Sequence, residues 1–562
     1  MLTRADATSA VASSERSSDS APRPAGLDSS WTEPARNVSS INQSRWKNLS
    51  VWVLVAALGL TVAGVIAESL WSAARGDDQI TSLAVLPLEN RSPDQQLDYF
   101  VDGMTEALMT DLASLPPIRV IARQSVMQYR ESGKSAGAIA RELRADVLVE
   151  GGVQRSGQRV RVDIRLIHGR TSRVLWATTY ERDLGDALAL QAEIGRAIAS
   201  ELHLTLDPSQ RERLAKRRPA NPEAWDAYLR ARFFWNQRTH ADMTRAVEWY
   251  ERAIQRDPSF PLAYAGLADV YATLGPPNMP PSELISRGTE AAEKAIQLDP
   301  LMGEPLAALG KLRSYAWDWE GAERHYRLAI QRAPGYAPAR YWYGSFLANH
   351  GRCDEALSEA REAERLDPVS LPGNVVVSGI ELRCRRVQQA ISRNRMILEF
   401  DPDYGQAHES LGRAYLMQGN GHEAIVMLER AVRLTGGRAT VLATLAYAYA
   451  SAGRRREAQA IAADLAARHA QGKGVASAWS VAIVHAGLQD DGVALTWLEH
   501  AYDDREEWLE SLAADYRFRN VHGHPRFQRL LDRLRLPKQP AATLTLDRRP
   551  GRPAMVRAES LQ

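Results

Sequence analysis

Three stretches of the sequence carry residue types that could do chemistry. Gly133–Gly137 reads GKSAG, which matches the G-x-S-x-G pattern of a nucleophilic serine. That pattern needs a strand directly before the serine and an acid and a histidine as partners, whereas this stretch lies in a loop that opens a helix. Ser135 is therefore expected to be the N-cap residue of that helix. A phosphate-binding loop is excluded as well, because Gln128 stands where that motif requires its first glycine.

The other two stretches contain histidines and carboxylates. His522 and His524 flank a glycine without a group of carboxylates nearby, so they lack the ligand set of a metal site. Asp98, Asp102 and Glu106 fall at the start of a predicted helix, where negative charge interacts favourably with the helix dipole. The sequence therefore predicts no catalytic residues, no metal site and no cofactor, and we expect a protein that is not an enzyme.

Composition limits the classes of protein that remain. The chain has 562 residues, enough for several domains, and its formal net charge of +2 does not indicate a nucleic-acid-binding surface. Two cysteines, Cys353 and Cys384, are too few for a disulfide-rich scaffold. They fall near equivalent turns of neighbouring units of the 34-residue repeat that is described below. They either form a disulfide in an oxidising compartment or remain two free thiols.

Leu49–Ala67 is an apolar stretch of nineteen residues without a charge. As a helix it would be roughly 28 Å long, close to the hydrocarbon thickness of a bilayer. Arg45 and Lys47 precede it and Glu68 follows it. This charge asymmetry predicts a single-pass membrane protein with a cytoplasmic N-terminus and its bulk outside the cytoplasm. In a bacterium that means the inner membrane and the periplasm. The alternative is a cleaved signal peptide, because the stretch ends in small residues.

The two ends of the chain are expected to lack folded domains. Residues 1–44 and 539–562 have compositions typical of disordered segments, and no folded effector domain is expected before the span. Within the span, Gly59, Ala63 and Ala67 recur at four-residue spacing. Such a row of small residues permits helix pairing and hence a homodimer.

A change of pattern at Ile80 marks the start of an α/β domain over residues 80–206. Buried strands are predicted in SLAVLPLEN and IRVIARQSV, and helices in YFVDGMTEALMTDLASL and SAGAIARELRA. Three further strands with alternating residues are predicted in DVLVEGGVQRSGQRVRVDIRLIHGRTSRVLWATTYERDL, followed by a last helix. The predicted order is β-α-β-α-β-β-β-α.

These segments resemble the TolB N-terminal-like domain of bacterial envelope and signalling proteins. The resemblance is carried by SLAVLPLEN, DYFVDGMTEAL, IRVIARQSV and the long three-strand segment, and it covers almost all of residues 80–206. In that family the domain often follows a DNA-binding or cyclase domain and precedes helical repeats, as in CadC-type membrane-spanning regulators. Residues 1–44 show neither a recognition-helix pattern nor a basic cluster, so neither of those domains is expected there.

The rest of the chain repeats with a period of 34 residues. Prolines mark successive units, at Pro300, Pro334, Pro368 and Pro402. The period and the small residues inside each unit resemble the tetratricopeptide repeat, which implies an all-α solenoid of about eight helical hairpins over residues 221–506. Residues 507–538 are expected to form capping helices.

The first helix of each tetratricopeptide unit lines the surface on which such arrays bind extended peptides. Repeat position assigns nine aromatic, cationic, amide and other residues to this surface: Lys311, Tyr315, Tyr341, Asn349, Arg383, Glu409, Arg413, Met417 and Tyr447. Its arginines would bind carboxylates. The sequence thus predicts a non-enzymatic, membrane-anchored periplasmic scaffold or sensor that binds a protein or peptide. The alternative is a membrane-linked transcriptional or signalling regulator, related to CadC-type proteins, that has no DNA-binding domain of its own.

Overall fold

The structure is a computed structural model of the chain. It describes residues 80–94, 97–113, 118–157, 159–183, 187–204, 221–237, 239–273, 275–276, 279–472 and 476–538. These residues belong to the compact unit that begins at Ile80. Three predicted segments lie outside the described residues and stay predictions: the N-terminal residues 1–44, the span with Gly59, Ala63 and Ala67, and the C-terminal residues 539–562. Within the described ranges, no helix is both long and apolar enough to cross a membrane.

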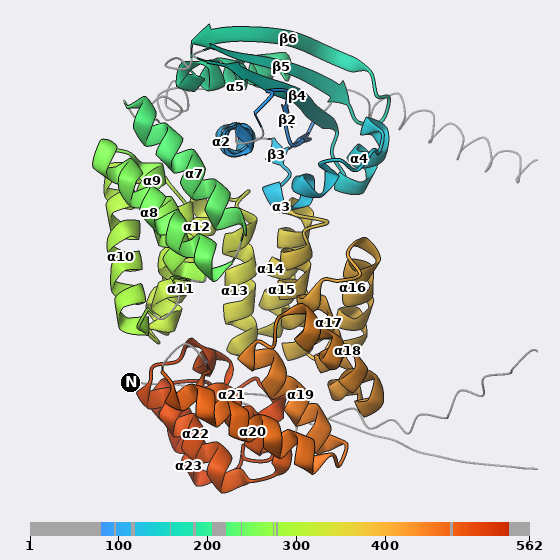
Figure 1. The fold of residues 1–562 in the computed structure, drawn as a ribbon, viewed down its shortest axis with the longest axis vertical. Helices are drawn as coiled ribbons and strands as arrows, with labels where there is room; N and C mark the ends of the chain where they lie inside the picture. The colour runs from blue at the N-terminus through green and yellow to red at the C-terminus, as the bar shows by residue number, and fades with distance from the viewer. Residues whose placement is uncertain are drawn as a thin grey trace, which may run out of the picture. The chain divides into compact units, whose positions relative to one another are not determined.

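Residues 80–204 form the α/β module (Figure 1). Its strands are β1 (Ser82–Val85), β2 (Glu89–Asn90), β3 (Arg119–Val120), β4 (Val147–Ser156), β5 (Arg159–His168) and β6 (Val174–Asp183). Its helices are α2 (Asp98–Ala113), α3 (Arg123–Val126), the 3-10 turn η2 (Met127–Tyr129), α4 (Ala136–Leu143) and α5 (Ala187–Glu201). The predicted order of strands and helices is present, with β2 and α3 as additions.

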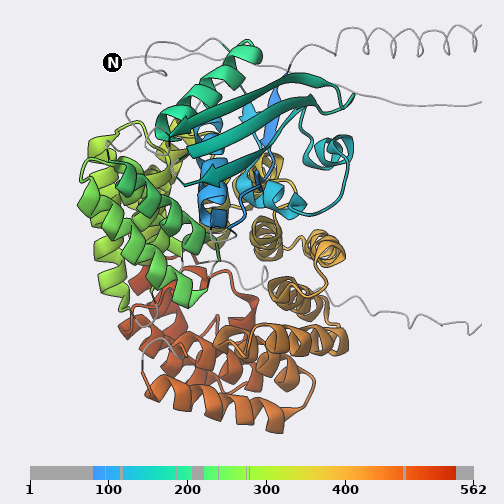
Figure 2. The same cartoon turned by 45° about the horizontal axis from the view of Figure 1, so that its top comes forward.

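The sheet of the module has the strand order β3-β1-β4-β5-β6, and β2 pairs with β4 beside this path. β1 is parallel to β3 and β4, whereas β4, β5 and β6 form an antiparallel meander (Figure 2). Along β5, Val160, Val162, Ile164 and Leu166 are fully buried, while the residues between them are at least partly exposed. One face of these strands therefore packs on the helices, and the other carries polar side chains.

The second predicted strand is much shorter than expected. Only Arg119–Val120 pair with β1, and the chain then turns at Ala122 into α3. The reason is a tertiary contact. The N–H of Ala122 donates to the carbonyl of Leu366 at 3.0 Å, and the N–H of Ser125 donates to Asp367 Oδ1 at 3.1 Å. Contacts with the helical repeats thus override the strand propensity of this segment.

Two predictions about helix starts also differ from the structure. Ser135 occupies the N-cap position of α4 as expected, but its side chain makes no capping hydrogen bond. Of the three carboxylates predicted to interact with a helix dipole, only Asp98 lies in the first turn of α2. Asp102 and Glu106 lie further along the helix, where the dipole has little effect, and both bind arginines instead.

Eight consecutive helix pairs follow in the described part of the chain and form a tetratricopeptide-like solenoid. The pairs are α7 (Pro222–Gln237) with α8 (His240–Arg256), α9 (Pro261–Thr273) with α10 (Pro281–Leu298), α11 (Glu304–Tyr315) with α12 (Trp319–Arg332), α13 (Ala337–Asn349) with α14 (Cys353–Leu366), α15 (Leu371–Arg383) with α16 (Val387–Phe400), α17 (Gly405–Gln418) with α18 (Gly421–Leu434), α19 (Ala439–Ser451) with α20 (Arg455–Ala470), and α21 (Ala478–Leu488) with α22 (Asp491–Asp503). From α13 to α19 the first helices begin 34 residues apart, which confirms the predicted period.

The last part of the described chain is less helical than expected. It contains the 3-10 turns η4 (Glu507–Ser511) and η5 (Tyr516–Phe518) and one α-helix, α23 (Pro525–Leu534). Only α23 resembles a capping helix.

Small residues hold the two helices of a pair close together, as the repeat pattern predicted. A Cβ added to Gly310 would lie 2.6 Å from the ring of Tyr326, and a Cβ added to Gly412 would lie 2.6 Å from the side chain of Leu428. Both distances are shorter than van der Waals contact allows. The second helix therefore presents its large side chain against the backbone of the first.

The α/β module and the first helix pairs share one hydrophobic core. One cluster of contacting buried side chains includes residues from Leu83 in β1 to Leu312 in α11. A second core extends from Leu382 in α15 to Leu536 after α23. Because buried apolar surface is the main stabilising contribution, we infer that the module and the first repeats fold as one body.

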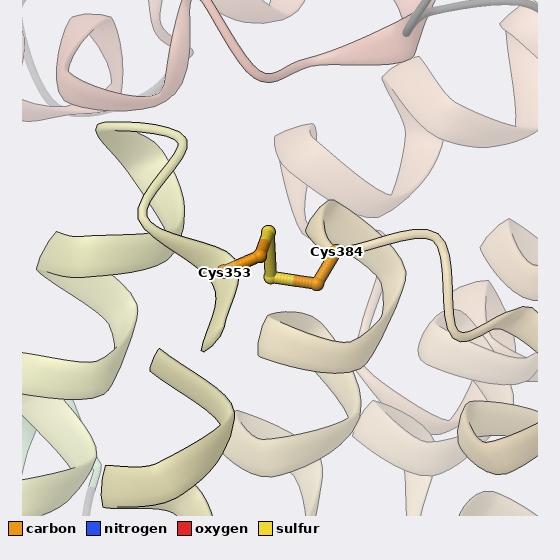
Figure 3. Close-up of a disulfide and its surroundings, with 2 residues drawn as sticks. All are labelled: Cys353 and Cys384. Atoms are coloured by element: carbon orange, nitrogen blue, oxygen red, sulfur yellow. A yellow bond between two sulfur atoms is a disulfide. The ribbon is translucent and has the colours of Figure 1, made fainter. Parts of the chain in front are cut away.

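The two cysteines are bonded to each other in the structure (Figure 3). Cys353 is the first residue of α14 and Cys384 follows the last residue of α15, and their Cα atoms lie 5.4 Å apart. This distance is usual for a disulfide. The bond joins neighbouring helix pairs.

Candidate functional site

The nine residues predicted to bind a peptide lie on α11, α13, α15, α17 and α19, the first helices of their pairs. We call the surface of these five helices the first-helix face. Four of the nine residues are buried: Tyr341, Asn349, Met417 and Tyr447. The other five are partly exposed: Lys311, Tyr315, Arg383, Glu409 and Arg413. Much of this face is therefore covered, and other parts of the same chain cover it.

One covering element is residues 506–521, which we call the C-terminal segment. Glu510 forms an ion pair with Lys311, with 3.9 Å between the carboxylate and Nζ. Arg519 Nη1 donates to the hydroxyl of Tyr447 at 2.7 Å. The ring of Tyr516 lies edge-on to the ring of Tyr447, with 6.1 Å between their centroids. Two of the residues predicted to bind a peptide, Lys311 and Tyr447, thus contact the C-terminal segment of the same chain.

Apolar side chains anchor the C-terminal segment. Leu509, Leu512, Phe518 and Val521 are all at most 1% exposed and belong to the second core. The ring of Phe518 lies 4.8 Å from the ring of Trp479 in α21. Full burial of such a side chain contributes about 1.5–3 kcal/mol. The segment is therefore a stable part of the fold.

A buried ion pair orients the C-terminal segment against the first-helix face. Arg517 binds Asp515 at 2.5 Å and donates through Nη1 to Thr444 Oγ1 at 3.0 Å. Burial on its own would raise the pKa of Asp515, but the charge and hydrogen bonds of Arg517 hold that pKa below its usual range. Burial, followed by the charge of Arg413, lowers the pKa of Arg383 to about 10, while Glu510 and Asp515 act in the opposite direction. Carboxylates of the same chain thus face the arginines of the predicted groove.

The α/β module also contacts the helical repeats, at the turn between α14 and α15. Ser125 Oγ donates to Asp367 Oδ1 at 2.7 Å, and the N–H of Val369 donates to Ser125 Oγ at 3.0 Å. Tyr341, one of the nine predicted residues, donates its hydroxyl to the carbonyl of Asp367 at 3.4 Å. Burial raises the pKa of Asp367 to about 6, although the hydrogen bonds from Ser125 act against this shift.

The module contacts the repeats at another place as well, where its helix α2 lies against α7. Glu106 binds Arg232, and Asn236 Nδ2 donates to Glu106 Oε2 at 3.1 Å. Tyr99 donates its hydroxyl to Asp226 Oδ1 at 2.7 Å, and the guanidinium of Arg230 lies 4.0 Å above the Tyr99 ring. These are charge-assisted hydrogen bonds in a partly buried setting, which makes them strong.

Sequence reasoning missed the residues that hold these contacts. Ser125 and Asp367 are separated by 242 positions, and Glu106 and Arg232 by 126. No local pattern pairs residues so far apart. One signal was present in α2, where Asp102 and Glu106 lie among otherwise buried positions. Carboxylates on a buried helix face require cationic partners.

A further cluster resembles a metal site but is explained by helix capping. His469, Asp504 and Glu506 have ligand atoms within 4.8 Å of one another. Both oxygens of Glu506 accept backbone N–H groups, from Ala478 at 2.7 Å and Trp479 at 3.0 Å. Glu506 therefore caps the start of α21. The histidines considered from the sequence also have structural roles, since His522 packs on Phe527 and His524 caps α23.

Comparison with known proteins gives partial matches. No family model matches the chain. Over 192 residues it is 35% identical to a protein of Rhizobium meliloti (strain 1021) named putative adenylate cyclase 3, and this stretch is 34% of the chain and 33% of that protein. Over 142 residues it is 25% identical to the transcriptional regulator HilA of Salmonella typhimurium, which is 25% of the chain and 26% of that protein. The chain thus spans about a third or less of these curated relatives.

Solved structures show only distant likeness. PilW, a type IV pilus biogenesis factor, aligns with 38% of the chain and 96% of its own length, at 17% identity and a TM-score of 0.32. The Cut9–Hcn1 hetero-tetramer of APC/C aligns with 62% of the chain and 63% of its own, at 16% identity and a TM-score of 0.39. At such TM-scores, the repeat architecture is established by this chain's own helix pairs.

Proposed function

We propose that the chain is a membrane-anchored periplasmic scaffold or sensor that binds proteins and has no catalytic activity of its own. In this proposal a TolB N-terminal-like α/β module and the tetratricopeptide-like solenoid act as one receptor body. The single span at Leu49–Ala67 tethers this body to the inner membrane.

The observation that carries the proposal is the occupation of the first-helix face by protein segments of the same chain. Glu510, Tyr516 and Arg519 contact Lys311 and Tyr447. Acidic and aromatic side chains on a segment of 3-10 turns thus match the lysine and tyrosine of this face. We infer that a partner presents the same chemistry, a segment without α-helix that carries carboxylates and an aromatic ring. It binds the partly exposed positions around Arg383, Glu409 and Arg413.

The disulfide supports the proposed compartment. Disulfides persist in the bacterial periplasm and are rare in the cytosol, where thiols are kept reduced. The bond between Cys353 and Cys384 therefore favours export of the repeats. The charge asymmetry around the span gives the same orientation independently.

A second candidate function is signalling or transcriptional regulation through a separate cytoplasmic partner. The relatives are named as an adenylate cyclase and a transcriptional regulator, two different outputs. Partial similarity to two proteins with different outputs is more consistent with ligand detection than with either output. The described contact between Ser125 and Asp367 would then couple the module to the repeats.

Crosslinking in intact cells, followed by purification of the full chain from membranes, tests partner binding. The informative variant is Arg413→Glu, which reverses a charge on the first-helix face, and the matched control is Arg361→Glu on α14, which is exposed. We expect R413E to lower partner recovery at least about tenfold, as for loss of a charged contact, with R361E unchanged. Equal recovery from both variants would remove the first-helix face from the proposal.

The orientation has its own test. A reporter enzyme that is active only in the periplasm, fused after Asp78, should be active. The same reporter fused after Gln43 should be inactive. Activity in the reverse order would overturn the proposed topology.

A further inference from the structure

The sheet of the α/β module ends in a strand that has one neighbour. Among the described residues, β6 pairs only with β5 and lies at the outer end of the strand order. Figure 1 shows β6 as the outermost strand of the sheet. The strand is ten residues long. Among the described residues no strand pairs with the edge that faces away from β5, so the backbone groups along this edge can pair with another chain.

The composition of β6 lacks the usual protection of an edge strand. Its first seven residues, Val174–Tyr180, read VLWATTY and contain no charge and no proline. They are rich in β-branched and aromatic residues, which favour strand pairing. Natural edge strands are usually short, or carry lysines, prolines or bulges along their length. Here the only irregularity lies at one end, opposite Leu166 and Ile167 of β5.

Burial along β6 shows that the sheet is incompletely covered at this edge. Trp176 and Tyr180 pair with Leu166 and Val162 of β5, which are fully buried. Both aromatic side chains pack against the module core but remain partly exposed. Val174, at the start of the strand, is 50% exposed. An additional strand beside β6 would bury the remaining surface of these aromatic side chains.

We propose that β6 pairs antiparallel with β6 of a second copy of this chain, with Thr178 opposite Thr178 at a two-fold axis. This register places Trp176 of each copy opposite Tyr180 of the other, and aromatic pairs are among the favourable cross-strand pairs. It places Asp183 opposite Arg173, so opposite charges meet at both ends of the paired strands. A register centred on Glu181 would instead place like charges face to face. The two-fold pairing is closed, because it consumes the exposed edge of both copies.

This interface is distinct from the predicted pairing of membrane helices through Gly59, Ala63 and Ala67. Since the span could bring two chains together without β6, molecular mass alone does not identify the interface. A site-specific crosslink does. The two native cysteines are bonded to each other, so a single introduced cysteine reports only on its own position.

The test uses the full chain in native membranes with Thr178→Cys. We expect mild oxidation to give a covalent dimer at least about tenfold more abundant than with Gln154→Cys, because Cα atoms of opposite strand residues lie within disulfide range. Gln154 is exposed on β4, away from the edge. Ala177→Cys checks the register, because residue 177 faces residue 179 of the other copy and should not crosslink to itself.

A charge variant provides the second measurement. Thr178→Lys places two ammonium groups opposite each other at the two-fold axis. It is compared with its parent in a full chain whose Gly59, Ala63 and Ala67 are replaced by leucine, so that pairing through the span is blocked. We expect T178K to weaken dimerisation roughly tenfold in sedimentation of this detergent-solubilised chain. Lysine is well tolerated on edge strands, so the fold should persist, which circular dichroism checks. Failure of T178C to crosslink, or unchanged dimerisation of T178K, would overturn the proposal.

Discussion

Asp367 is a buried carboxylate at the contact between the module and the repeats, and its protonation affects stability. Its carboxylate is buried, accepts hydrogen bonds from Ser125 and has a pKa of about 6 in the folded chain. In the unfolded chain the value returns to about 3.8. Between these two pH values the folded state holds a proton on Asp367 that the unfolded state has lost. The contribution of Asp367 to the free energy of unfolding therefore falls as pH rises from about 4 to about 6, and it is constant above that.

Replacing this carboxyl group tests the linkage. We compare the free energy of unfolding of Asp367→Asn with that of wild type. Raising the pH from about 4 to about 7.5 should shift this difference by about 2–3 kcal/mol in favour of the variant, because only wild type contains this titrating group. Urea unfolding at both pH values measures the difference. The control is Asp403→Asn, at an exposed aspartate, which should show no such pH dependence. A difference between D367N and wild type that is the same at both pH values contradicts the assignment.

Gly266 in α9 tests the close packing between neighbouring helix pairs, because it faces Tyr250 in α8 of the preceding pair. A Cβ at this position would lie 2.4 Å from the ring of Tyr250, so Gly266→Ala should destabilise the chain by about 1–3 kcal/mol. The control is Gly421→Ala in α18, where an added Cβ meets nothing within 4 Å. That change should be neutral or slightly stabilising, because alanine favours helix. Thermal unfolding of the two variants compares them directly, and equal melting temperatures would contradict the packing argument.

At the scale of elements, the disulfide between α14 and α15 closes a loop of 31 positions. Crosslinking a loop of this length restricts the unfolded chain by about 3–4 kcal/mol. We expect Cys353→Ala with Cys384→Ala to lose stability in this range. A reductant should lower the unfolding midpoint of wild type to that of the double variant and leave the double variant unchanged. A reductant effect on the double variant would point to a different cause.

The C-terminal segment is the element that decides how much of the first-helix face is free. Asp515→Ala leaves the buried charge of Arg517 without its partner, which should cost about 3–5 kcal/mol. We expect hydrogen exchange of residues 506–521 to become faster. The control is Asp403→Ala, which removes the exposed ion pair with Arg430 and should leave the stability of the segment unchanged within about 0.5 kcal/mol. If exchange in the segment stays slow in D515A, the apolar anchors alone hold it in place.

At the scale of the whole molecule, the shared core makes the module and the first repeats interdependent. When residues 1–204 and 221–562 are expressed as two polypeptides, we expect them to co-purify, because the core from Leu83 to Leu312 crosses between them. Gly103→Ala should weaken this association roughly tenfold, since its Cβ would lie 2.5 Å from the side chain of Leu229. Gly195→Ala is the matched control, with no atom closer than 3.9 Å. Equal association of both variants would contradict this docking geometry.

Local patterns in the sequence determined the parts of this protein. The 34-residue period, the small residues at positions such as Gly310 and the alternation along β5 depend on neighbours within one or two elements. They therefore predicted the helix pairs, the order of strands and helices along the module and the positions of the nine first-helix residues. The shorter second strand was not predicted, because the hydrogen bonds of Ala122 and Ser125 go to residues in the repeats.

Tertiary structure alone decided which surfaces are free. The sequence placed Tyr341 and Tyr447 on a binding surface, but both are buried. Tyr341 donates to Asp367 at the turn that leads into the next helix pair, and Tyr447 binds Arg519, which lies 72 positions further along the chain. Contacts between Glu106 and Arg232, and between Asp367 and Ser125, have no local signature in the sequence. The physical reason is that periodicity reports which side of an element is apolar. It does not report which distant segment will bury that side, because that depends on the combined shape and charge of elements more than a hundred residues apart.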